Sequence, residues 1–480
     1  MVTFLLSIAL LIAGYFTYGK IVDRIFKPDN RATPATAQQD GVDYVPMGNK
    51  KIFLIHLLNI AGLGPIVGAI QGALWGPVVY LWIVAGSILA GGVHDYIVGM
   101  LSMRNGGCSI ADITGQFLGR AIKQIMRVFS VFLLLMLGTV FAIGSATSIS
   151  MITSDSASYM LWFVVVIAYF FLATFLPIDK IIGKIYPVFG VCLIIMAAGV
   201  GIMLIAKGYQ LPEMSLVNMH PEGLPIFPFM FITVACGAIS GFHATQSPLM
   251  ARCLTTEKKG RQTFYGAMIA EGVIALVWAA AGVAFYNGTG GLYAVLSNPN
   301  IGPNGAVYQI CMTLLGPVGG VLAMVGVIAC PITSGDTAFR SARLILADWF
   351  KLDQKSIGKR LLITVPILAF AVIVAYGFDY MVVWRYFAWS NQTLAMIALW
   401  AASVYLWQEK KPYWLTALPA VFMSAVSVTY FLAAPECLGL MEKGMLPLSC
   451  TIGIVAAIAL FGLFLKNTVF GKRRNTTLPH

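Results

Sequence analysis

The chain has 480 residues, of which 59% are hydrophobic and 10% are charged, and its mean hydropathy is +0.84. This composition excludes a soluble globular protein and is typical of a polytopic helical membrane protein. The net charge of +12 arises from 31 basic and 19 acidic residues. Contact with anionic lipid explains such an excess, so we expect a lipid bilayer and no nucleic acid as partner.

Apolar stretches separated by charged or turn-rich connections predict an all-α fold with about thirteen transmembrane helices. In chain order the predicted spans are about 2–18, 52–75, 77–101, 124–150, 159–176, 186–206, 226–250, 263–287, 312–343, 361–377, 382–407, 412–433 and 446–465.

The distribution of basic residues predicts the topology. Of the 31 basic residues, 28 lie in alternate connections and in the C-terminal tail, whereas the other connections hold only Lys207, Arg385 and Lys443. By the positive-inside rule, the N-terminus is expected outside and the C-terminus in the cytoplasm. The first span has no basic segment before it, so we expect a retained anchor helix and not a cleaved signal peptide.

Two groups of five predicted helices follow the anchor and its polar cytoplasmic connection, which together occupy residues 1–51. The groups cover 52–206 and 226–407 in opposite orientations, and two additional helices and a cytoplasmic tail complete the chain at 412–480. Such an inverted repeat is typical of secondary transporters.

The first helix of each group carries a glycine-rich break, which predicts a discontinuous helix and a binding site at the middle of the membrane. The substrate-binding residues predicted at these breaks are Gly62, Gly64, Pro65, Gly237, Ser240 and Gly241. The alternative is that the glycines only allow close helix packing. His243, two residues after the second break, is expected to contact the substrate or else to be a hydrogen-bonded core histidine.

A third interruption is predicted around Pro331, which lacks a backbone N–H. The hydroxyls of Thr333 and Ser334, together with carbonyls freed at the first break, suit Na⁺. The alternative is that both hydroxyls bond to the preceding helical turn. Asp336 lies four residues before Arg340, a spacing that favours an ion pair on one helix face.

Asp95 and Glu271, like Asp336, lie within predicted spans, where an ionised carboxylate is costly and usually functional. We predict that Glu271 or Asp95 carries a coupling proton. The alternative is a permanent pair with a buried base, or a hydrogen bond to His94 or His56.

Two further features remain open at the level of sequence. The polar run at 389–393, Trp-Ser-Asn-Gln-Thr, either lines a pathway or joins helices. The eight cysteines contain no CxxC pair and are predicted to be core residues, although Cys437 and Cys450 both lie near the outer face, where they can pair.

Six sequence blocks in order resemble the carbon starvation protein A (CstA) family of bacterial inner-membrane transporters. They are Asp40 to Pro46, His56 to Gly68, Ala90 to Asp95, Ser240 to Ala244, Tyr265 to Met268 with Glu271, and Thr333 to Thr337 with Arg340. The resemblance implies membership of the amino acid–polyamine–organocation superfamily, whose LeuT-like architecture has two inverted five-helix repeats. The chain departs from the family's long members in lacking their extended C-terminal half and in having Ile55-His56 where they have paired histidines.

The resemblance implies uptake of pyruvate or peptides during nutrient limitation, driven by a proton or sodium gradient across the bacterial cytoplasmic membrane. We predict alternating access, with the half-helix that begins near Pro65 presenting backbone N–H groups to a substrate carboxylate. We expect no cofactor beyond the coupling ion, H⁺ or Na⁺.

Three alternatives remain: a channel, a membrane nutrient sensor, and an intramembrane aspartyl protease using Asp336 and Asp379. The protease motif needs a glycine where Thr333 stands, and HExxH, CxxC and phosphate-loop motifs are absent from the sequence, so we do not expect an enzyme.

Overall fold

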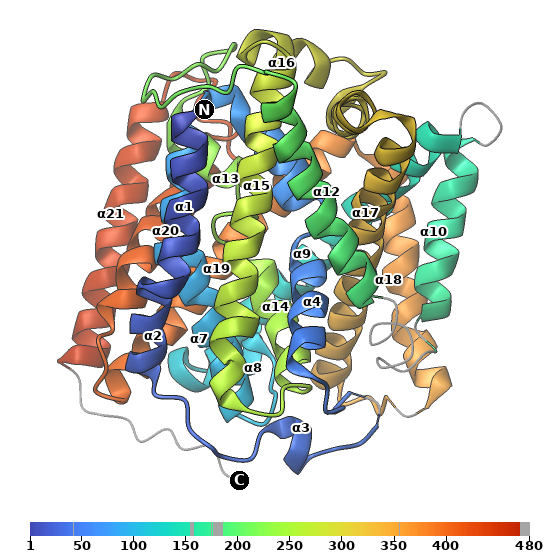
Figure 1. Ribbon diagram of the computed structural model, residues 1–480. Helices are drawn as coiled ribbons and strands as arrows, with labels where there is room; N and C mark the ends of the chain where they lie inside the picture. The colour runs from blue at the N-terminus through green and yellow to red at the C-terminus, as the bar shows by residue number, and fades with distance from the viewer. Residues whose placement is uncertain (42, 154–157, 174, 176–185, 355, 471–480) are drawn as a thin grey trace.

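The computed structural model describes all residues except 42, 154–157, 174, 176–185, 355 and 471–480. Its regular structure is helical, and the described residues add only one isolated parallel bridge, between Met47 and Leu254. Most helices run roughly parallel to one axis and form a bundle (Figure 1). The predicted all-α class is confirmed.

Each predicted span coincides with helical structure. The segments of the first predicted group are α4 (Asn49–Ile60), η1 (Gly64–Gly68), α5 (Ala69–Gly72), η2 (Ala73–Trp75), α6 (Val78–Ala85), η3 (Gly86–Gly91), α7 (Gly92–Arg104), α9 (Arg120–Thr153), α10 (Tyr159–Ala173) and α12 (Tyr186–Ala206). Those of the second are η5 (Ile226–Met230), α13 (Phe231–Thr233), α14 (Gly241–Ala251), η6 (Glu257–Lys259), η7 (Arg261–Tyr265), α15 (Gly266–Phe285), α17 (Gly302–Phe350), α18 (Ile357–Gly377) and α19 (Tyr380–Gln408).

The remaining helices flank or cap these two groups. They are α1 (Val2–Phe16), α2 (Tyr18–Phe26), α3 (Pro34–Ala37), α8 (Ile110–Leu118), α16 (Thr289–Leu296), α20 (Trp414–Ala433), α21 (Leu446–Phe464) and η8 (Leu465–Val469). The first predicted span is too short, because α1 and α2 together continue to Phe26. The predicted connection at 177–185 and the end of the tail lie outside the described residues.

Nine helices within the described ranges are long and apolar enough to cross a membrane, or ten when the bent pair Asn49–Ile60 and Gly64–Trp75 counts as one span. The other three predicted spans correspond to α10, which has 15 described residues, to the broken segment α13–α14, and to α19. The count of thirteen and the division into two repeats therefore stay predictions.

Both predicted breaks are present. The first helix stops at Ile60 and resumes at Gly64, and the direction of its second half is bent by 56° from that of the first. The second stops at Thr233 and resumes at Gly241, with Gly237 at φ +92°, a conformation that favours glycine. Discontinuous helices at both positions are confirmed.

The two breaks pack directly against each other. A Cβ added to Gly64 would lie 2.3 Å from the Cβ of Cys236, and one added to Gly237 would lie 2.5 Å from Ala275 and 3.8 Å from Pro65. Each of the two breaks therefore needs a glycine, because a side chain at Gly64 or Gly237 would overlap its neighbour. The predicted helix interruption and the close packing given as its alternative are both present, and the binding site at the breaks stays a prediction.

The third predicted interruption is wrong. Helix α17 runs through Pro331 without leaving helical geometry, and its one non-helical residue is Gly316, at φ +71°. Within the helix, the hydroxyls of Thr333 and Thr337 donate to carbonyls of the preceding turn, at Cys330 (2.9 Å) and Thr333 (3.2 Å). Such hydroxyls and neighbouring helices help a buried helix to tolerate proline.

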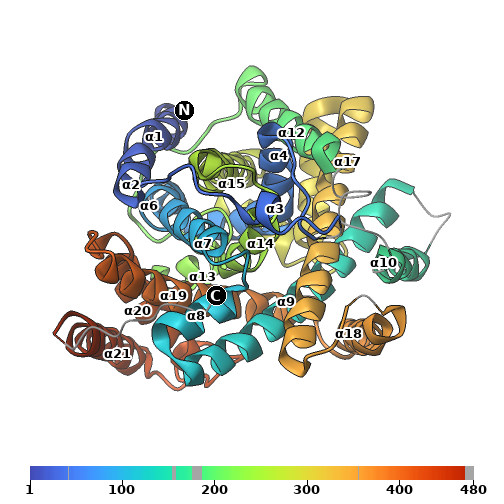
Figure 2. The same ribbon diagram turned by 90° about the horizontal axis from the view of Figure 1, so that it is seen from below.

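The polar connection after α2 is anchored at the end of the bundle shown from below in Figure 2, where α7, α14 and α15 lie near the centre. The buried carboxylate of Glu257 accepts two bonds of 3.0 Å from the Arg104 guanidinium and one of 3.1 Å from the Asp29 backbone N–H. The guanidinium also lies 4.1 Å from the centre of the Phe26 ring. This paired buried charge ties the connection to α7 and η6.

We predict that Gly64→Ala destabilises the protein by about 1–3 kcal/mol, because the added methyl group overlaps Cys236. Thermal unfolding in detergent measures the loss. Gly462→Ala is the matched control, since nothing lies within 4 Å of a Cβ at that position. Adding Cys236→Gly to Gly64→Ala should restore part of the stability, and equal stability of all these variants would contradict the close contact.

Candidate functional site

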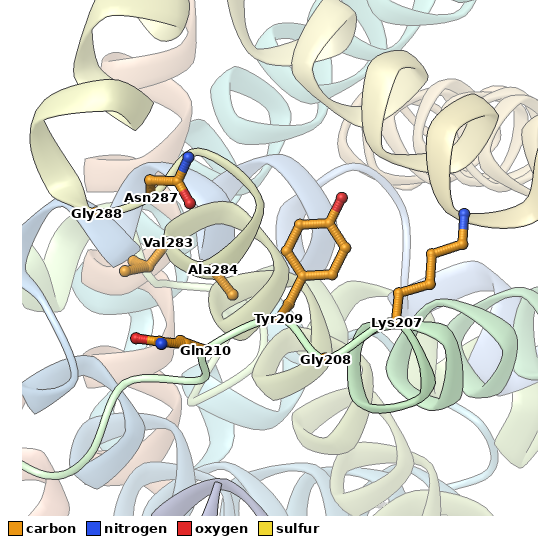
Figure 3. A pocket seen from close by; sticks show the side chains of 8 residues that line it. All are labelled: Lys207, Gly208, Tyr209, Gln210, Val283, Ala284, Asn287 and Gly288. Carbon is orange, nitrogen blue, oxygen red and sulfur yellow. The ribbon is translucent and has the colours of Figure 1, made fainter.

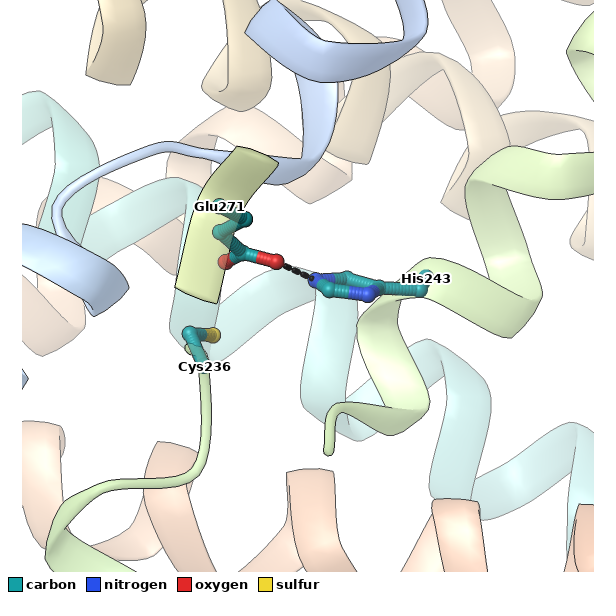
Figure 4. A group of neighbouring side chains, drawn as sticks. All are labelled: Cys236, His243 and Glu271. Carbon is teal, nitrogen blue, oxygen red and sulfur yellow. Dashed lines mark ion pairs between the residues drawn. The ribbon is translucent and has the colours of Figure 1, made fainter. Parts of the chain in front are cut away.

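Four side chains converge beside the second break. Asp95 lies on α7. Figure 4 shows the other three, His243 on α14, Glu271 on α15 and Cys236 in the unwound segment between α13 and α14. The charged side chains are fully buried, and Cys236 is 3% exposed. The second break thus forms one site with two of the predicted acidic residues, Asp95 and Glu271.

His243 lies between two carboxylates. Its Nδ1 is 2.7 Å from Oδ2 of Asp95, and its Nε2 is 3.2 Å from Oε2 of Glu271. The other oxygen of Asp95 lies 2.8 Å from Nδ1 of His94. Because an ionised carboxylate only accepts hydrogen bonds, both Nδ1 atoms act as donors. The hydrogen bond to His94, which was left open above, is therefore present together with the contact to His243.

Several buried polar atoms around this cluster have no hydrogen-bond partner among the described residues. They include both ring nitrogens of His56, both amide atoms of Asn59, Nε2 of His94, both carboxyl oxygens of Glu271 and Oε1 of Gln246. Buried polar groups in folded proteins are normally satisfied by protein or by water. The unsatisfied atoms of His94 and Glu271, which belong to the cluster or adjoin it, indicate a site that takes up water, an ion or a polar ligand.

The two predicted Na⁺ ligands behave differently. The Ser334 hydroxyl reaches the last turn of α4, where it donates to the carbonyls of Asn59 at 2.8 Å and Leu58 at 3.3 Å. Within the described part of the chain, the Thr333 hydroxyl donates to the Cys330 carbonyl, which lies in the same helix, α17. Ser334 therefore lies at the first break, whereas Thr333 follows the back-bonding alternative.

The polar run at 389–393 joins helices. Oδ1 of Asn391 accepts bonds from the Phe242 backbone N–H at 2.7 Å and the Ser240 hydroxyl at 3.1 Å, at the start of α14. Gln392 donates to the Phe231 carbonyl, and the hydroxyls of Thr393 and Ser427 are 2.6 Å apart. Of the two interpretations of this run, the structural one fits these contacts.

The predicted glycines also lie at close contacts. An added Cβ would lie 2.4 Å from Phe141 at Gly62 and 2.3 Å from the Asn391 carbonyl oxygen at Gly241. The predicted substrate-binding residues are thus brought together around the two breaks, with Ser334 beside them and Thr333 apart. Cys236 was missed as a site residue because a lone cysteine carries no local signal, whereas Asn391 lies in the polar run that the sequence already singled out.

Asp336 belongs to a separate contact. It is buried and accepts a bond of 2.9 Å from the Tyr186 hydroxyl, while Arg340 donates to the Ala173 carbonyl at 3.2 Å. Asp379, its predicted protease partner, is an exposed residue that caps the start of α19. All eight cysteines are free, including Cys437 and Cys450.

A cavity of about 520 Å³ lies elsewhere, where the ends of α12 and α15 approach each other (Figure 3). Its lining residues are Lys207, Gly208, Tyr209, Gln210, Val283, Ala284, Asn287 and Gly288. None of them belongs to either break. The ammonium group of Lys207 donates to the Thr313 carbonyl at 2.7 Å, so this residue also links α12 to α17.

The chain has a LeuT-like fold, in which two broken helices meet at a buried polar cluster. The structure is similar to a manganese transporter from Eremococcus coleocola, with a TM-score of 0.55 at 15% identity, covering 90% of this chain and 98% of the other. It is also similar to a nucleobase-cation-symport-1 family transporter in a closed conformation, with a TM-score of 0.54 at 17% identity, covering 87% and 93%. At such identities the similarity concerns the fold alone.

The chain belongs to the CstA family. The profile of the family described as "Carbon starvation protein CstA" matches residues 1–161, 144–302 and 306–430. An uncharacterized membrane protein of Haemophilus influenzae is 43% identical over 350 residues, which cover 62% of this chain and 94% of that protein.

Relatives with functional names match less of their own length. A peptide transporter CstA of Campylobacter jejuni is 30% identical, over 56% of this chain and 48% of that protein. The pyruvate/proton symporter BtsT of Escherichia coli is 27% identical, over 62% and 50%. The chain thus spans about half the length of these two relatives.

We predict that Asn391→Ala weakens the start of α14, because it leaves the Phe242 N–H and the Ser240 hydroxyl without their acceptor. Loss of a buried partner costs about 1–3 kcal/mol. Thermal unfolding measures the change, with Asn467→Ala at an exposed position of η8 as the control. An unchanged unfolding temperature for Asn391→Ala would contradict the role of this amide.

Proposed function

We propose that the protein is a secondary active transporter that imports a small carboxylate-bearing nutrient, such as a peptide, an amino acid or pyruvate, by ion-coupled alternating access. The observation that carries this proposal is the buried chain Asp95–His243–Glu271 beside two crossed helix breaks. Intramembrane ionisable groups of this kind mark proton and substrate pathways in transporters. The functional names of the CstA relatives agree with it.

The first break supplies a site for the substrate carboxylate. The second half of that helix begins at Gly64 and runs to Trp75, and the first N–H groups of a helix lack intrahelical acceptors. These groups and the helix dipole attract an anion. Since Gly64 packs against Cys236 in this structure, binding of a substrate to these N–H groups requires the two breaks to move apart.

Glu271 is the residue that we assign to proton coupling. Its carboxyl group has one charged neighbour, His243, within ion-pair distance, and neither of its oxygens makes a hydrogen bond within the described part of the chain. A proton on Glu271 cancels its attraction for His243, so α14 and α15 are then held together less tightly. Among the described residues, Asp95 has hydrogen-bond contacts with two histidines, whereas Glu271 has none. We therefore assign Asp95 the role of orienting His243.

We predict that Glu271→Gln abolishes uptake driven by an imposed proton gradient and leaves substrate exchange intact. Glutamine has nearly the shape of glutamate but carries no titrating proton. Radiolabelled substrate uptake into proteoliposomes measures both activities, with Glu409→Gln at the exposed end of α19 as the control. Concentrative uptake at the wild-type rate would remove Glu271 from the mechanism.

Na⁺ is the second candidate for the coupling ion, because the Ser334 hydroxyl lies beside two carbonyls at the end of α4. Oxygen ligands of this kind suit a hard cation. We predict that Ser334→Ala removes any stimulation of uptake by Na⁺. Thr333→Val should retain that stimulation, because the Thr333 hydroxyl bonds within its own helix. Equal Na⁺ dependence in both variants would contradict a Na⁺ site at Ser334.

The substrate is identified by a thermal-shift screen of the purified protein against pyruvate, amino acids, dipeptides and tripeptides, each with and without Na⁺. A ligand that binds the folded state raises the unfolding temperature in proportion to its occupancy. Stabilisation by carboxylates and not by their amides supports the proposed subsite. The channel alternative predicts flux without saturation, and the sensor alternative predicts binding without flux.

A further inference from the structure

Three potential metal ligands meet at the second break. The Sγ atom of Cys236, a ring nitrogen of His243 and a carboxyl oxygen of Glu271 all lie within 4.8 Å of one another, and the three residues are buried. Figure 4 shows that they come from three segments: the unwound chain, α14 and α15. We propose that they form a binding site for one divalent transition-metal ion of the zinc class. This proposal rests on the cluster used in the proposed function.

The ligand types and their spacing suit such an ion. Thiolate, imidazole and carboxylate are the ligands that Zn²⁺ selects, at about 2.0–2.3 Å, so the ligand atoms of a tetrahedral site are roughly 3.3–3.8 Å apart. Nε2 of His243 and Oε2 of Glu271 are 3.2 Å apart, close to that spacing. The Cys236 sulfur must move about 1 Å closer to the other two ligand atoms to complete the set, and a side-chain rotation can supply this movement.

The nitrogen and oxygen ligands have no hydrogen-bond partner among the described residues. Although Nε2 of His243 and Oε2 of Glu271 lie within ion-pair distance, they do not form a hydrogen bond, and Oε1 of Glu271 also makes none with the described residues. A buried carboxyl group with both oxygens unsatisfied is an acceptor for an ion. Three protein ligands also leave a fourth position open to water or to a substrate carboxylate.

The surrounding residues match the outer shell of a metal site. Nδ1 of His243 is held by Asp95 at 2.7 Å, and Asp95 is itself held by His94. A carboxylate at the far nitrogen of a histidine ligand fixes its ring and leaves the near nitrogen facing the ion. The amide Nδ2 of Asn391 lies 3.5 Å from the Cys236 sulfur and is a donor to a thiolate, and Oγ of Ser240 lies 3.5 Å from the same sulfur.

Replacement of protons by the metal ion leaves the net charge of the buried cluster unchanged. A divalent ion replaces one proton on the Cys236 thiol and one on His243, so the buried cluster keeps the same net charge after binding. The ion and the coupling proton use the same carboxyl group of Glu271. Bound metal therefore blocks proton coupling, and the site is reached when the two breaks separate.

The test is titration of purified, metal-stripped protein in detergent with Co²⁺, a spectroscopic substitute for Zn²⁺. We expect about one equivalent to produce a thiolate-to-Co²⁺ absorption band and the visible bands of a tetrahedral site. Cys236→Ala should remove the thiolate band and weaken binding at least about tenfold. Cys253→Ala, a buried cysteine outside the cluster, should leave both unchanged.

Glu271→Gln provides a second variant if Cys236→Ala does not fold, and it should also weaken Co²⁺ binding while the thiolate band is retained at saturation. Folded wild-type protein without a Co²⁺ band, or with the same band after loss of Cys236, would overturn the metal site. Because the spectrum needs no transport, uptake without Co²⁺ binding contradicts only this inference, and Co²⁺ binding without uptake contradicts only the proposed function.

Discussion

The position of His243 between Asp95 and Glu271, fully buried, is the constraint on which the rest of the site depends. Three charged groups inside a membrane protein are stable only when their partners are held in place, because each loses its hydration. Here α7, α14 and α15 supply one group each. The break before α14 frees the backbone around Cys236 and Gly237 to approach these helices, so the helix interruption and the charge cluster belong together.

Close backbone contact is the second requirement. Gly64 faces Cys236, Gly237 faces Ala275, and an added Cβ at Gly91 would lie 2.2 Å from the Ala238 carbonyl oxygen. A larger side chain at Gly64 would separate the two breaks, and one at Gly237 or Gly91 would push the second break away from α15 or from η3. These glycines therefore allow the close packing that places the free helix ends beside the buried charges.

Much of the fold was predictable from sequence, since hydropathy and helix-breaking residues act locally. The breaks at Gly62 to Pro65 and Cys236 to Gly241 follow from glycine and proline chemistry, and the isolation of Asp95 and Glu271 in apolar spans predicts a functional role for them. That His243 joins these two carboxylates was not predictable, because this depends on how three helices pack. Pro331 shows the limit of local reasoning: the helix there continues, and the actual kink lies at Gly316.

The central claim is that an ion gradient drives accumulation of a carboxylate substrate through this site. Its most direct test is uptake by wild-type protein in proteoliposomes under an imposed proton gradient, an imposed Na⁺ gradient, or neither. We predict accumulation above the external concentration under at least one gradient and equilibration without any. Identical uptake under all three conditions would contradict ion-coupled transport.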